Sequence, residues 1–294
     1  MDPETAMAAS ALRRLAPLLV AEVKKKRTLH ALSDAFVLEQ AQPLLTQAPV
    51  LRLASHPNVA KSRDFRRLVK HVRERLHEVY GVFQKRKKDL TALKVHLGAI
   101  GVLDAAAVEL HRSILACHHS TQERLPFYPE MYEQIFRLTG TPRSILDLGA
   151  GLNPLSYPFM NLHHVRYTAV ELTEEDCRFL QDYFAMMRPV SPLEGQAVVA
   201  DLTKPPEFSA VDVCFLFKIL DTLETLRFDA SRALLPHIQA KHLVVSFPTR
   251  TLCGRKPIRS RGWFLKLLRE FKCVPKVLDF QNERFYIIPW TGGS

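Results

Sequence analysis

The sequence predicts an α/β protein in which an all-helical N-terminal region precedes a Rossmann-like sheet. Three observations support this prediction. Apolar residues recur at three- and four-residue spacing from Ala8 to about Arg112, as they do along one side of a helix. From Arg143 onward, short runs rich in Val, Ile and Phe alternate with helical stretches, which is typical of a parallel sheet. A glycine-bearing turn follows the first of these runs.

Charge and composition limit the possible partners. The chain has 294 residues, of which 47% are hydrophobic, so it can bury a substantial core. Its formal net charge of +11 favours a polyanionic partner, and residues 1–112 hold most of the excess, with 20 Lys and Arg against 11 Asp and Glu. No apolar run is long enough for a membrane helix, and no signal-peptide pattern opens the chain. We therefore expect a cytoplasmic monomer without membrane contact.

Metal binding is not expected. The five cysteines are scattered and include no Cys-x-x-Cys pair, so neither a disulfide framework nor a structural zinc site is indicated. The tandem histidines His118-His119 and His163-His164 lack Cys, Asp or Glu neighbours at the spacing of metal ligands. Such histidines are usually surface or capping residues.

The clearest predicted helix spans about Lys61 to Phe83. Its apolar residues form one stripe, and five cations lie away from that stripe: Arg63, Arg66, Arg67, Lys70 and Arg73. Most charged helix faces are simply solvated. Here, however, only Asp64 and Glu74 lie nearby, whereas an ordinary surface helix alternates the two signs of charge. We therefore favour contact between these cations and nucleic-acid phosphates.

Seven strands are predicted in the second part of the chain. The apolar runs place them at about 143–148, 165–170, 196–201, 211–217, 242–247, 274–280 and 284–289. Only the short turn Gln281-Asn282-Glu283 joins the last two, so they should form an antiparallel hairpin at the edge of the sheet. A seven-stranded sheet that ends in such a hairpin resembles the S-adenosylmethionine-dependent methyltransferase variant of the doubly wound fold.

Acidic residues stand where the first three predicted strands end. Asp147 comes just before Gly149 and Gly151, whose lack of a side chain lets the backbone approach a ligand closely. Glu171 ends the second strand, where a carboxylate can accept hydrogen bonds from both hydroxyls of a ribose. Asp201 ends the third strand, within reach of an adenine amino group. Each acid alone has an alternative role in a cap or turn, but three at successive strand ends favour a nucleoside-containing ligand.

Two cofactors share this pattern. A nicotinamide dehydrogenase requires a third glycine, so that the next helix packs close beneath a pyrophosphate. This sequence has Asn153-Pro154-Leu155 at that place. Proline fits the first turn of a helix, and S-adenosylmethionine has no pyrophosphate. The sequence therefore favours S-adenosylmethionine.

Arg124 lies upstream of the sheet, in the segment His118 to Leu125. Its planar guanidinium is suited to a bidentate contact with the methionine carboxylate of the donor. Alternatively, Ser120-Thr121 and Glu123-Arg124 are capping and surface residues. The spacing leaves both interpretations open.

Several separate motifs closely resemble the aminoglycoside-resistance 16S rRNA (guanine(1405)-N7)-methyltransferases. They are His118 to Leu125, Asp147 to Leu155, Phe217-Lys218-Ile219-Leu220 and Ser246 to Arg255, with Arg75-Leu76-His77, Gly81 and Phe83 upstream. The likeness covers about residues 73–290. It implies a donor pocket lined by Phe83, His118, His119, Ser120, Arg124, Gly149, Glu171, Asp201, Leu202 and Phe217, to which the turn adds Asp147 and Gly151.

The resemblance implies methylation of guanine N7 in the decoding A site of 16S rRNA, within the 30S subunit, and resistance to drugs such as gentamicin and kanamycin. Guanine N7 attacks through an in-plane lone pair, so we expect no catalytic base, only alignment of the reacting atoms. A-form RNA hides N7 in a deep, narrow groove, so the base must be flipped or locally distorted. Phosphate contacts around the target are expected from the cations of the Lys61 to Phe83 helix, together with Arg250, Arg255, Lys256, Arg259 and Arg261.

The sequence departs from the family pattern at three places. Glu171 stands where the family more often has Asp, and Leu220-Asp221 where it has Leu-Pro. After Gly254, the stretch Arg255-Lys256-Pro257-Ile258-Arg259 replaces a glycine-rich, Lys-containing one, which affects the target base more than the donor. Two alternatives stay open: a methyltransferase of the same fold with another RNA or non-RNA acceptor, and a non-catalytic RNA-binding assembly factor.

These observations divide the chain into two expected domains. Residues 1–112 form a basic helical RNA-binding domain, and residues 113–294 form a Rossmann-like methyltransferase domain. Within the second domain, residues 113–140 are expected to be a helical connection that contributes to the donor pocket.

Overall fold

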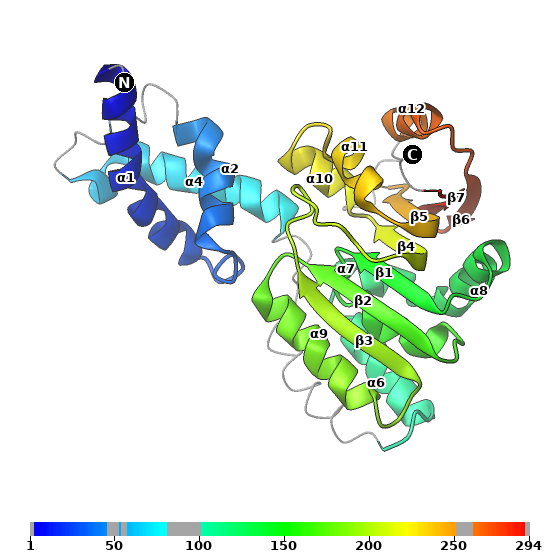
Figure 1. Ribbon diagram of the computed structural model, residues 1–294. Coiled ribbons are helices and arrows are strands. Elements are labelled where there is room, and N and C mark those ends of the chain that lie inside the picture. The colour runs from blue at the N-terminus through cyan, green and yellow to red at the C-terminus, as the bar shows by residue number, and fades with distance from the viewer. Residues whose placement is uncertain (1–2, 46–52, 54–57, 81–100, 251–260, 292–294) are drawn as a thin grey trace. The chain divides into compact units, whose positions relative to one another are not determined.

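The computed structural model describes residues 3–45, 53, 58–80, 101–250 and 261–291 (Figure 1). The chain forms two compact units, Met1–Gln84 and Lys85–Ser294, so the boundary lies earlier than the expected residue 112. Helix α6 (Ala105–Leu115) explains the difference, because it packs against η3 (Asn153–Phe159) of the second unit. Within the described ranges, no helix is long and apolar enough to span a bilayer.

The first unit contains α1 (Pro3–Lys24), α2 (Asp34–Leu45), η1 (Val59–Lys61) and α4 (Arg63–Val79), and α4 packs against both α1 and α2. Helix α4 begins after Ser62, whose hydroxyl oxygen accepts a hydrogen bond of 3.1 Å from the backbone N–H of Phe65. Its apolar stripe is buried through Phe65, Leu68, Val69, Val72 and Leu76. The predicted helix is thus confirmed from Arg63 to Val79. Phe83 lies outside the described residues.

The second unit opens with the helices α6, α7 (His119–Arg124) and α8 (Tyr128–Thr139). The strands are β1 (Ser144–Leu148), β2 (Val165–Glu171), β3 (Leu193–Val199), β4 (Val211–Phe217), β5 (Ala240–Pro248), β6 (Lys276–Phe280) and β7 (Glu283–Pro289). The connections contain η3, α9 (Glu174–Met187), α10 (Leu220–Leu226), α11 (Ala230–Leu234), η4 (Leu235–His237) and α12 (Gly262–Glu270).

The strands form one sheet in the order β3-β2-β1-β4-β5-β7-β6. Neighbours are parallel except where β7 pairs with β5 and β6. The predicted sheet and its terminal hairpin are therefore confirmed. Strand β3 spans 193–199 rather than the expected 196–201, because it is an edge strand with several exposed positions and a weak apolar pattern. The strand order reverses between β1 and β4, where doubly wound sheets bind ligands.

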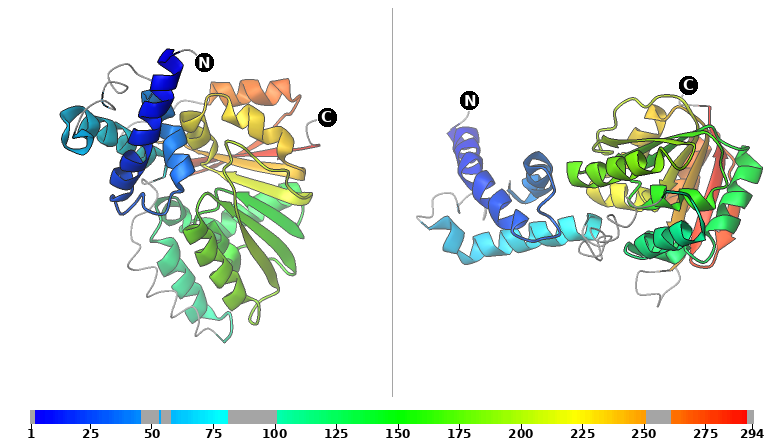
Figure 2. Two further views of the ribbon diagram at one scale, coloured as in Figure 1. Left: turned by 60° about the vertical axis from the view of Figure 1, so that its left-hand side comes forward. Right: turned by 90° about the horizontal axis from the view of Figure 1, so that it is seen from below.

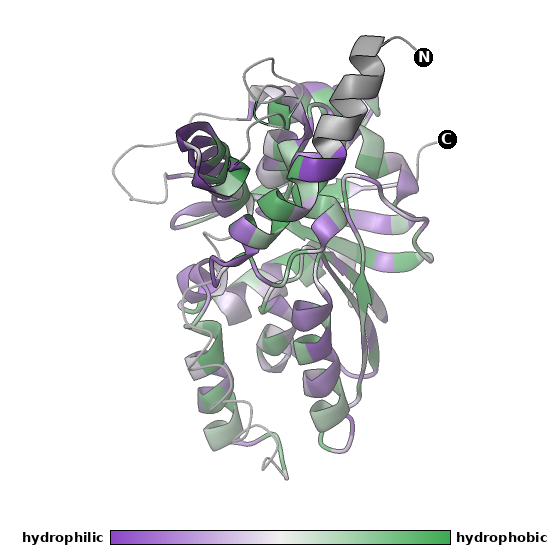
Figure 3. Ribbon diagram, turned by 90° about the vertical axis from the view of Figure 1, so that its left-hand side faces the viewer, coloured by the Kyte–Doolittle hydropathy of each residue, from purple (hydrophilic) through white to green (hydrophobic). Residues whose placement is uncertain are grey.

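Helices cover both faces of the sheet (Figure 2). One hydrophobic cluster joins the strands to α6, α8 and α9 and includes Tyr128, Tyr183 and Phe215. The other joins them to α10, α11 and α12 and includes Leu220 and Phe264. Hydrophilic and hydrophobic colours share the same helices in Figure 3, since each helix turns one side inward. Burial on both faces is the reason why the central strands are nearly continuous apolar runs.

Candidate functional site

The turn after β1 requires its glycines. Gly149 and Gly151 have φ angles of 69° and 54°, in the region that disfavours residues with a side chain. A Cβ atom on Gly149 would lie 2.7 Å from Cδ1 of Ile219, which is too close. The N–H of Gly149 donates to the carbonyl of Val170 on β2 at 2.9 Å. The turn is thus pressed against the carboxyl ends of two neighbouring strands, as the sequence predicts.

Glu171 is the last residue of β2, and its carboxylate faces this turn. Oε1 accepts a 2.5 Å hydrogen bond from the N–H of Gly151, and Oε2 accepts one of 3.2 Å from Leu172. A carboxylate has about four acceptor positions, so capacity is left for two ligand hydroxyls. Burial, followed by the nearby Asp176 carboxylate, raises the pKa of Glu171 to about 8.

Asp147 lies in the interior and makes internal hydrogen bonds. Its side chain is only 1% exposed, and Oδ2 accepts hydrogen bonds from Tyr167 at 2.6 Å and from the Asn153 amide at 3.0 Å. Burial raises the pKa of Asp147 to about 6. In the described structure this carboxylate therefore supports the turn from beneath, and its predicted contact with the donor stays a prediction.

Asp201 and Leu202 follow β3 at the same edge of the sheet as Glu171. The backbone N–H of Ala200 donates to the carbonyl of Glu171 at 2.9 Å, which places the next two residues beside the end of β2. Oδ1 of Asp201 accepts from the backbone and the hydroxyl of Thr203, at 2.9 and 2.7 Å. The acid thus follows its strand by two residues rather than ending it, and Leu202 is buried.

The tandem histidines of α7 have different surroundings. His118 precedes the helix, and its Cε1 lies 3.5 Å from the position that a Cβ atom on Gly151 would occupy. His119 instead lies 3.4 Å from Glu123 through Nδ1 and Oε1. Ser120 is buried. Among the residues that the structure describes, no group of three or more His, Cys, Asp or Glu side chains is arranged to hold a metal ion.

Arg124 makes the bidentate contact expected of its planar fork, but its partner here is a carboxylate of the protein. Nε and Nη2 donate to the two oxygens of Glu283, at 2.8 to 3.1 Å. The two side chains are 2% and 0% exposed. The guanidinium also lies 4.7 Å above the ring of Phe217, the last residue of β4. The alternative of an exposed surface arginine is therefore wrong.

Lys218 joins this ion pair into a buried network. Its Nζ lies 2.6 Å from Oε2 of Glu123 and 3.0 Å from Oε2 of Glu283. The hydroxyl of Ser246 donates to Oε1 of Glu283 at 2.5 Å. Burial alone would raise the pKa of Glu283, but Arg124 and Lys218 hold it below its ordinary value. Two positive and two negative groups thus balance at the carboxyl ends of β4 and β5.

The backbone at Lys218 has an unfavourable conformation. Its φ angle of 57° is rare for a residue with a side chain, and its N–H donates to the carbonyl and the hydroxyl of Ser246, each at 3.1 Å. Lys218 and Glu283 are site residues that the sequence did not single out. Lys218 belonged to a matched motif, which was a usable signal, whereas Glu283 lay in a turn with no distinguishing pattern.

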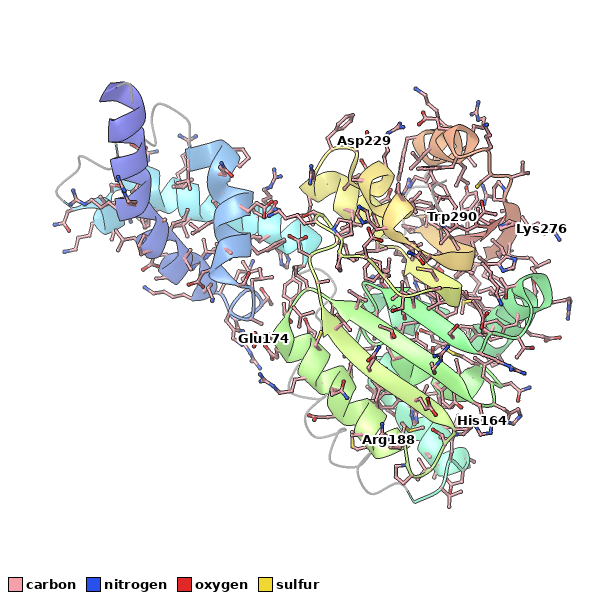
Figure 4. The ribbon with its side chains drawn as sticks, in the orientation of Figure 1. His164, Glu174, Arg188, Asp229, Lys276 and Trp290 are labelled. Atoms are coloured by element: carbon pink, nitrogen blue, oxygen red, sulfur yellow. The ribbon has the colours of Figure 1, made fainter. Side chains whose placement is uncertain are left out.

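The cations of α4 fall into two groups. Arg63, Arg66, Arg67 and Lys70 are exposed, and Figure 4 shows nitrogen-tipped side chains projecting from this helix. Arg73 is half-buried, and its Nη2 donates to the backbone carbonyl of Glu22 on α1. This hydrogen bond ties Arg73 to α1, and its predicted contact with phosphate stays a prediction. Arg250 is exposed after β5, and Arg255 and Lys256 lie outside the described residues.

Arg261 also differs from expectation, since the sequence grouped it with the phosphate-binding residues beside the target. Its guanidinium pairs with Asp221 at the start of α10 and lies 5.5 Å above the ring of Phe247. Its side chain is only 17% exposed. Arg261 therefore ties the start of α12 to α10 within the second unit.

Comparison with known proteins agrees with this architecture. The family model described as "Ribosomal RNA methyltransferase (FmrO)" matches residues 45–272. A "16S rRNA (guanine(1405)-N(7))-methyltransferase" from Micromonospora rosea is 31% identical over 270 residues, which is 88% of this chain and 96% of that protein. A protein of the same name from Frankia casuarinae is 34% identical over 254 residues, 81% of this chain and 86% of its own length.

Solved structures show the same fold. The 16S rRNA methyltransferase RmtF, in complex with S-adenosyl-L-homocysteine, superposes with a TM-score of 0.71 at 23% identity, over 94% of this chain and 98% of that one. The 16S rRNA methylase RmtB gives a TM-score of 0.66, also at 23% identity, over 93% and 98%. With the family match over more than three-quarters of its length, this chain belongs to the ribosomal RNA methyltransferase (FmrO) family.

Proposed function

We propose that this protein transfers a methyl group from S-adenosylmethionine to N7 of guanine 1405 in 16S rRNA of the 30S subunit, and that this modification confers aminoglycoside resistance. The observation that carries the proposal is the likeness to the Micromonospora and Frankia proteins, which bear this activity as their name and match over at least 81% of the chain. The substrate places the enzyme in the cytoplasm, where we expect it to act as a monomer.

The turn and its surroundings fit S-adenosylmethionine. The turn presents backbone without side chains at both glycines, and a Cβ atom on Gly151 would already contact the His118 ring, 3.5 Å from Cε1. Glu171 keeps acceptor capacity for the two ribose hydroxyls, and Asp201 lies at the same sheet edge for the adenine amino group. We propose that these residues hold the donor together with Phe83, His119, Ser120, Gly149, Leu202 and Phe217. When bound, the donor supplies a methyl group activated by a positively charged sulfur.

Arg124 has a limited part in this proposal. Glu283 already occupies Nε and Nη2, so a contact with the donor's carboxylate has to come from the remaining guanidinium hydrogens. Its better supported role is to keep the Glu123–Lys218–Glu283 network neutral beside the donor site. We propose both roles, and they are separable by experiment.

Methylation of guanine N7 requires no catalytic base from the protein. Guanine N7 has a lone pair and no proton, so the chain has to orient the base rather than deprotonate it. We propose that Arg63, Arg66, Arg67 and Lys70 of the N-terminal unit contact rRNA phosphates, with Arg250, Arg255 and Lys256 near the target. Of the cations in this set that the structure describes, Lys70 is the one with a carboxylate nearby, Glu74 at 3.7 Å, so the others have no ion pair among the described residues that competes with a phosphate.

Expression in a susceptible bacterial strain tests the proposal. We expect tolerance of gentamicin and kanamycin. N7 methylation leaves the pairing edge of guanine intact, so rRNA from purified 30S subunits is first reduced with borohydride and cleaved with aniline, and primer extension should then stop next to guanine 1405. A Glu171→Ala variant is the control, and it should lose both effects. Methyl transfer to another nucleotide would replace the proposed target. If calorimetry detects no binding of the donor, that result would instead favour a non-catalytic RNA-binding factor.

A further inference from the structure

A buried polar cluster lies beneath the glycine turn and joins it to α8. Its members come from β1, η3, β2 and α8, and all are buried: Asp147, Asn153, Ser156, Tyr167, Tyr128 and Tyr132. Neither the family match nor the predicted site residues explain why so many polar groups gather in the core. Burying polar groups is costly unless they are hydrogen-bonded to one another, so their arrangement is informative.

Asn153 is the centre of this cluster. Its amide nitrogen donates to Oδ2 of Asp147 at 3.0 Å, and its amide oxygen accepts from the hydroxyls of Tyr128 and Tyr132 at 3.4 and 3.3 Å. The side chain is 2% exposed. Asn153 therefore links β1 on one side to α8 on the other. An uncharged amide carries its donors and its acceptor on separate atoms, so one side chain can face a carboxylate on one side and a hydroxyl on the other.

The backbone of Asn153 is fixed at the same time. Its N–H donates to the carbonyl of Ala150 at 2.9 Å, which closes the turn. Its carbonyl accepts a hydrogen bond of 2.6 Å from the hydroxyl of Ser156. The hydroxyl oxygen of Ser156 in turn lies 2.6 Å from the hydroxyl oxygen of Tyr132. Because Ser156 uses its hydrogen on Asn153, Tyr132 is the donor between the two hydroxyls. Tyr132 has one hydrogen, so it donates mainly to Ser156, which in turn holds the backbone of residue 153, and its 3.3 Å approach to the Asn153 amide oxygen is the longer branch of a shared hydrogen bond.

Asp147 gives the cluster its charge. Tyr167 donates to the same oxygen as Asn153, at 2.6 Å, and burial raises the pKa of the carboxyl. Removal of the Asn153 amide would leave a buried carboxylate with one donor fewer and the Tyr128 hydroxyl without its acceptor. The end of the turn would then be held by the backbone hydrogen bonds of residue 153 without the side-chain links to β1 and α8.

We propose that Asn153, supported by Tyr132, is a positioning residue that sets the geometry of the Gly149–Leu152 turn for the methyl donor. The inference rests on the proposed use of S-adenosylmethionine. Asn153 is expected to affect the affinity for the donor indirectly, through the turn, because its side chain is directed into the core and away from solvent. If the turn is disordered in a variant, donor binding has to order it, and this cost lowers the affinity. Once the donor is bound, the complex resembles that of the parent protein, so kcat changes little.

The test compares Asn153→Leu and Tyr132→Phe with Gln134→Leu, which removes an exposed amide of α8 bonded to Glu130. We expect the dissociation constant and KM for S-adenosylmethionine to rise about tenfold in Asn153→Leu, with kcat at saturating donor within about twofold of the parent. Tyr132→Phe should shift in the same direction by a smaller factor. Gln134→Leu should behave like the parent.

Donor binding is measured by calorimetry without rRNA, so the result does not depend on which nucleotide is methylated. Tyr132→Phe removes a single oxygen and keeps the ring, so it tests the proposal even when Asn153→Leu fails to fold. A purely structural role would lower the midpoint of thermal unfolding and leave the donor dissociation constant unchanged in the folded variants. That outcome, or a fall in kcat at unchanged KM, would overturn the proposal.

Discussion

Arg124 and Glu283 form a buried bidentate ion pair although 159 residues separate them along the chain. The pair joins α7, ahead of the sheet, to the first residue of β7. Neither side chain is more than 2% exposed, so each charge depends on the other for compensation. This dependence makes the pair a sensitive point for both stability and function.

Replacement of Arg124 by Ala should destabilise the fold. The variant leaves Glu283 buried with only Lys218 and Ser246, and we expect a loss of about 3–5 kcal/mol in the free energy of unfolding. Arg137→Ala is the matched control, because its i,i+4 partner Glu133 and Arg137 itself are both 68% exposed. The control should lose less than about 1 kcal/mol. Urea denaturation measures both, and equal losses would contradict the role of burial.

The donor contact of Arg124 can then be tested in a folded protein. We expect Arg124→Met combined with Glu283→Gln to recover much of the stability lost in Arg124→Ala, because both charges of the pair are removed together. Donor affinity in this double variant reports the predicted carboxylate contact. A higher dissociation constant for the donor supports the contact. An affinity equal to that of the parent shows that Arg124 acts only through Glu283.

Donor binding should depend on pH through Glu171. With a pKa of about 8, this carboxyl is mostly protonated at neutral pH in the free protein. Ribose hydroxyls donate to the anion, so the proton has to leave when the donor binds. We expect affinity to rise as the pH increases from about 6 to about 8 and to level off above that range.

Calorimetry in two buffers with different ionisation enthalpies measures this proton release. Glu171→Gln is the control, since its amide does not titrate while the donor's own amino group still does. The difference between the two proteins isolates Glu171. A pH dependence that is identical in both would show that another group is responsible.

Charge reversal of the exposed α4 cations should weaken subunit binding. Arg63→Glu with Arg66→Glu and Arg67→Glu is expected to lower affinity for 30S subunits at least about tenfold and to reduce its salt dependence. Donor affinity should not change. A matched triple variant at Arg143, Arg166 and Arg188 reverses exposed cations near the amino ends of the strands. Similar losses in both variants would indicate a non-specific charge effect.

Gly195 on β3 should not tolerate a side chain. A Cβ atom there would lie 1.9 Å from Cδ1 of Phe184, a buried ring of α9. We expect Gly195→Ala to lower the free energy of unfolding by about 1–3 kcal/mol. Gly262→Ala in α12 adds the same atom where no atom of the described residues lies within 4 Å, so it should be neutral or slightly stabilising. Chemical denaturation of the two variants provides the comparison.

The elements were predictable where a local pattern carries the information. Strand β4 lies at Val211–Phe217, as its apolar run predicted, because a strand buried on both faces has few polar positions. Helix α6 was correctly predicted as helical but assigned to the wrong unit. Periodicity shows that a helix has a buried side, and it does not show which core receives that side.

The site was predictable only in part, for the same reason. The glycines and Glu171 stand next to strand ends, so their meeting follows from the parallel topology. The partner of Arg124 lies on a distant strand, and the contact of Arg73 with Glu22 depends on how α1 packs. Pairings of this kind are set by tertiary structure and have no signature at either residue.

The distance between Arg124 and Glu283 along the chain also orders events during synthesis. Every strand up to β6 leaves the ribosome before β7 delivers Glu283. Until then the guanidinium has to stay hydrated, because burial without a partner is costly, and α7 cannot settle on Phe217. A translation product that ends before β7 would therefore keep the Arg124 guanidinium without its carboxylate. The last strand of the sheet thus couples completion of the chain to assembly of the ionic network at the carboxyl ends of β4 and β5.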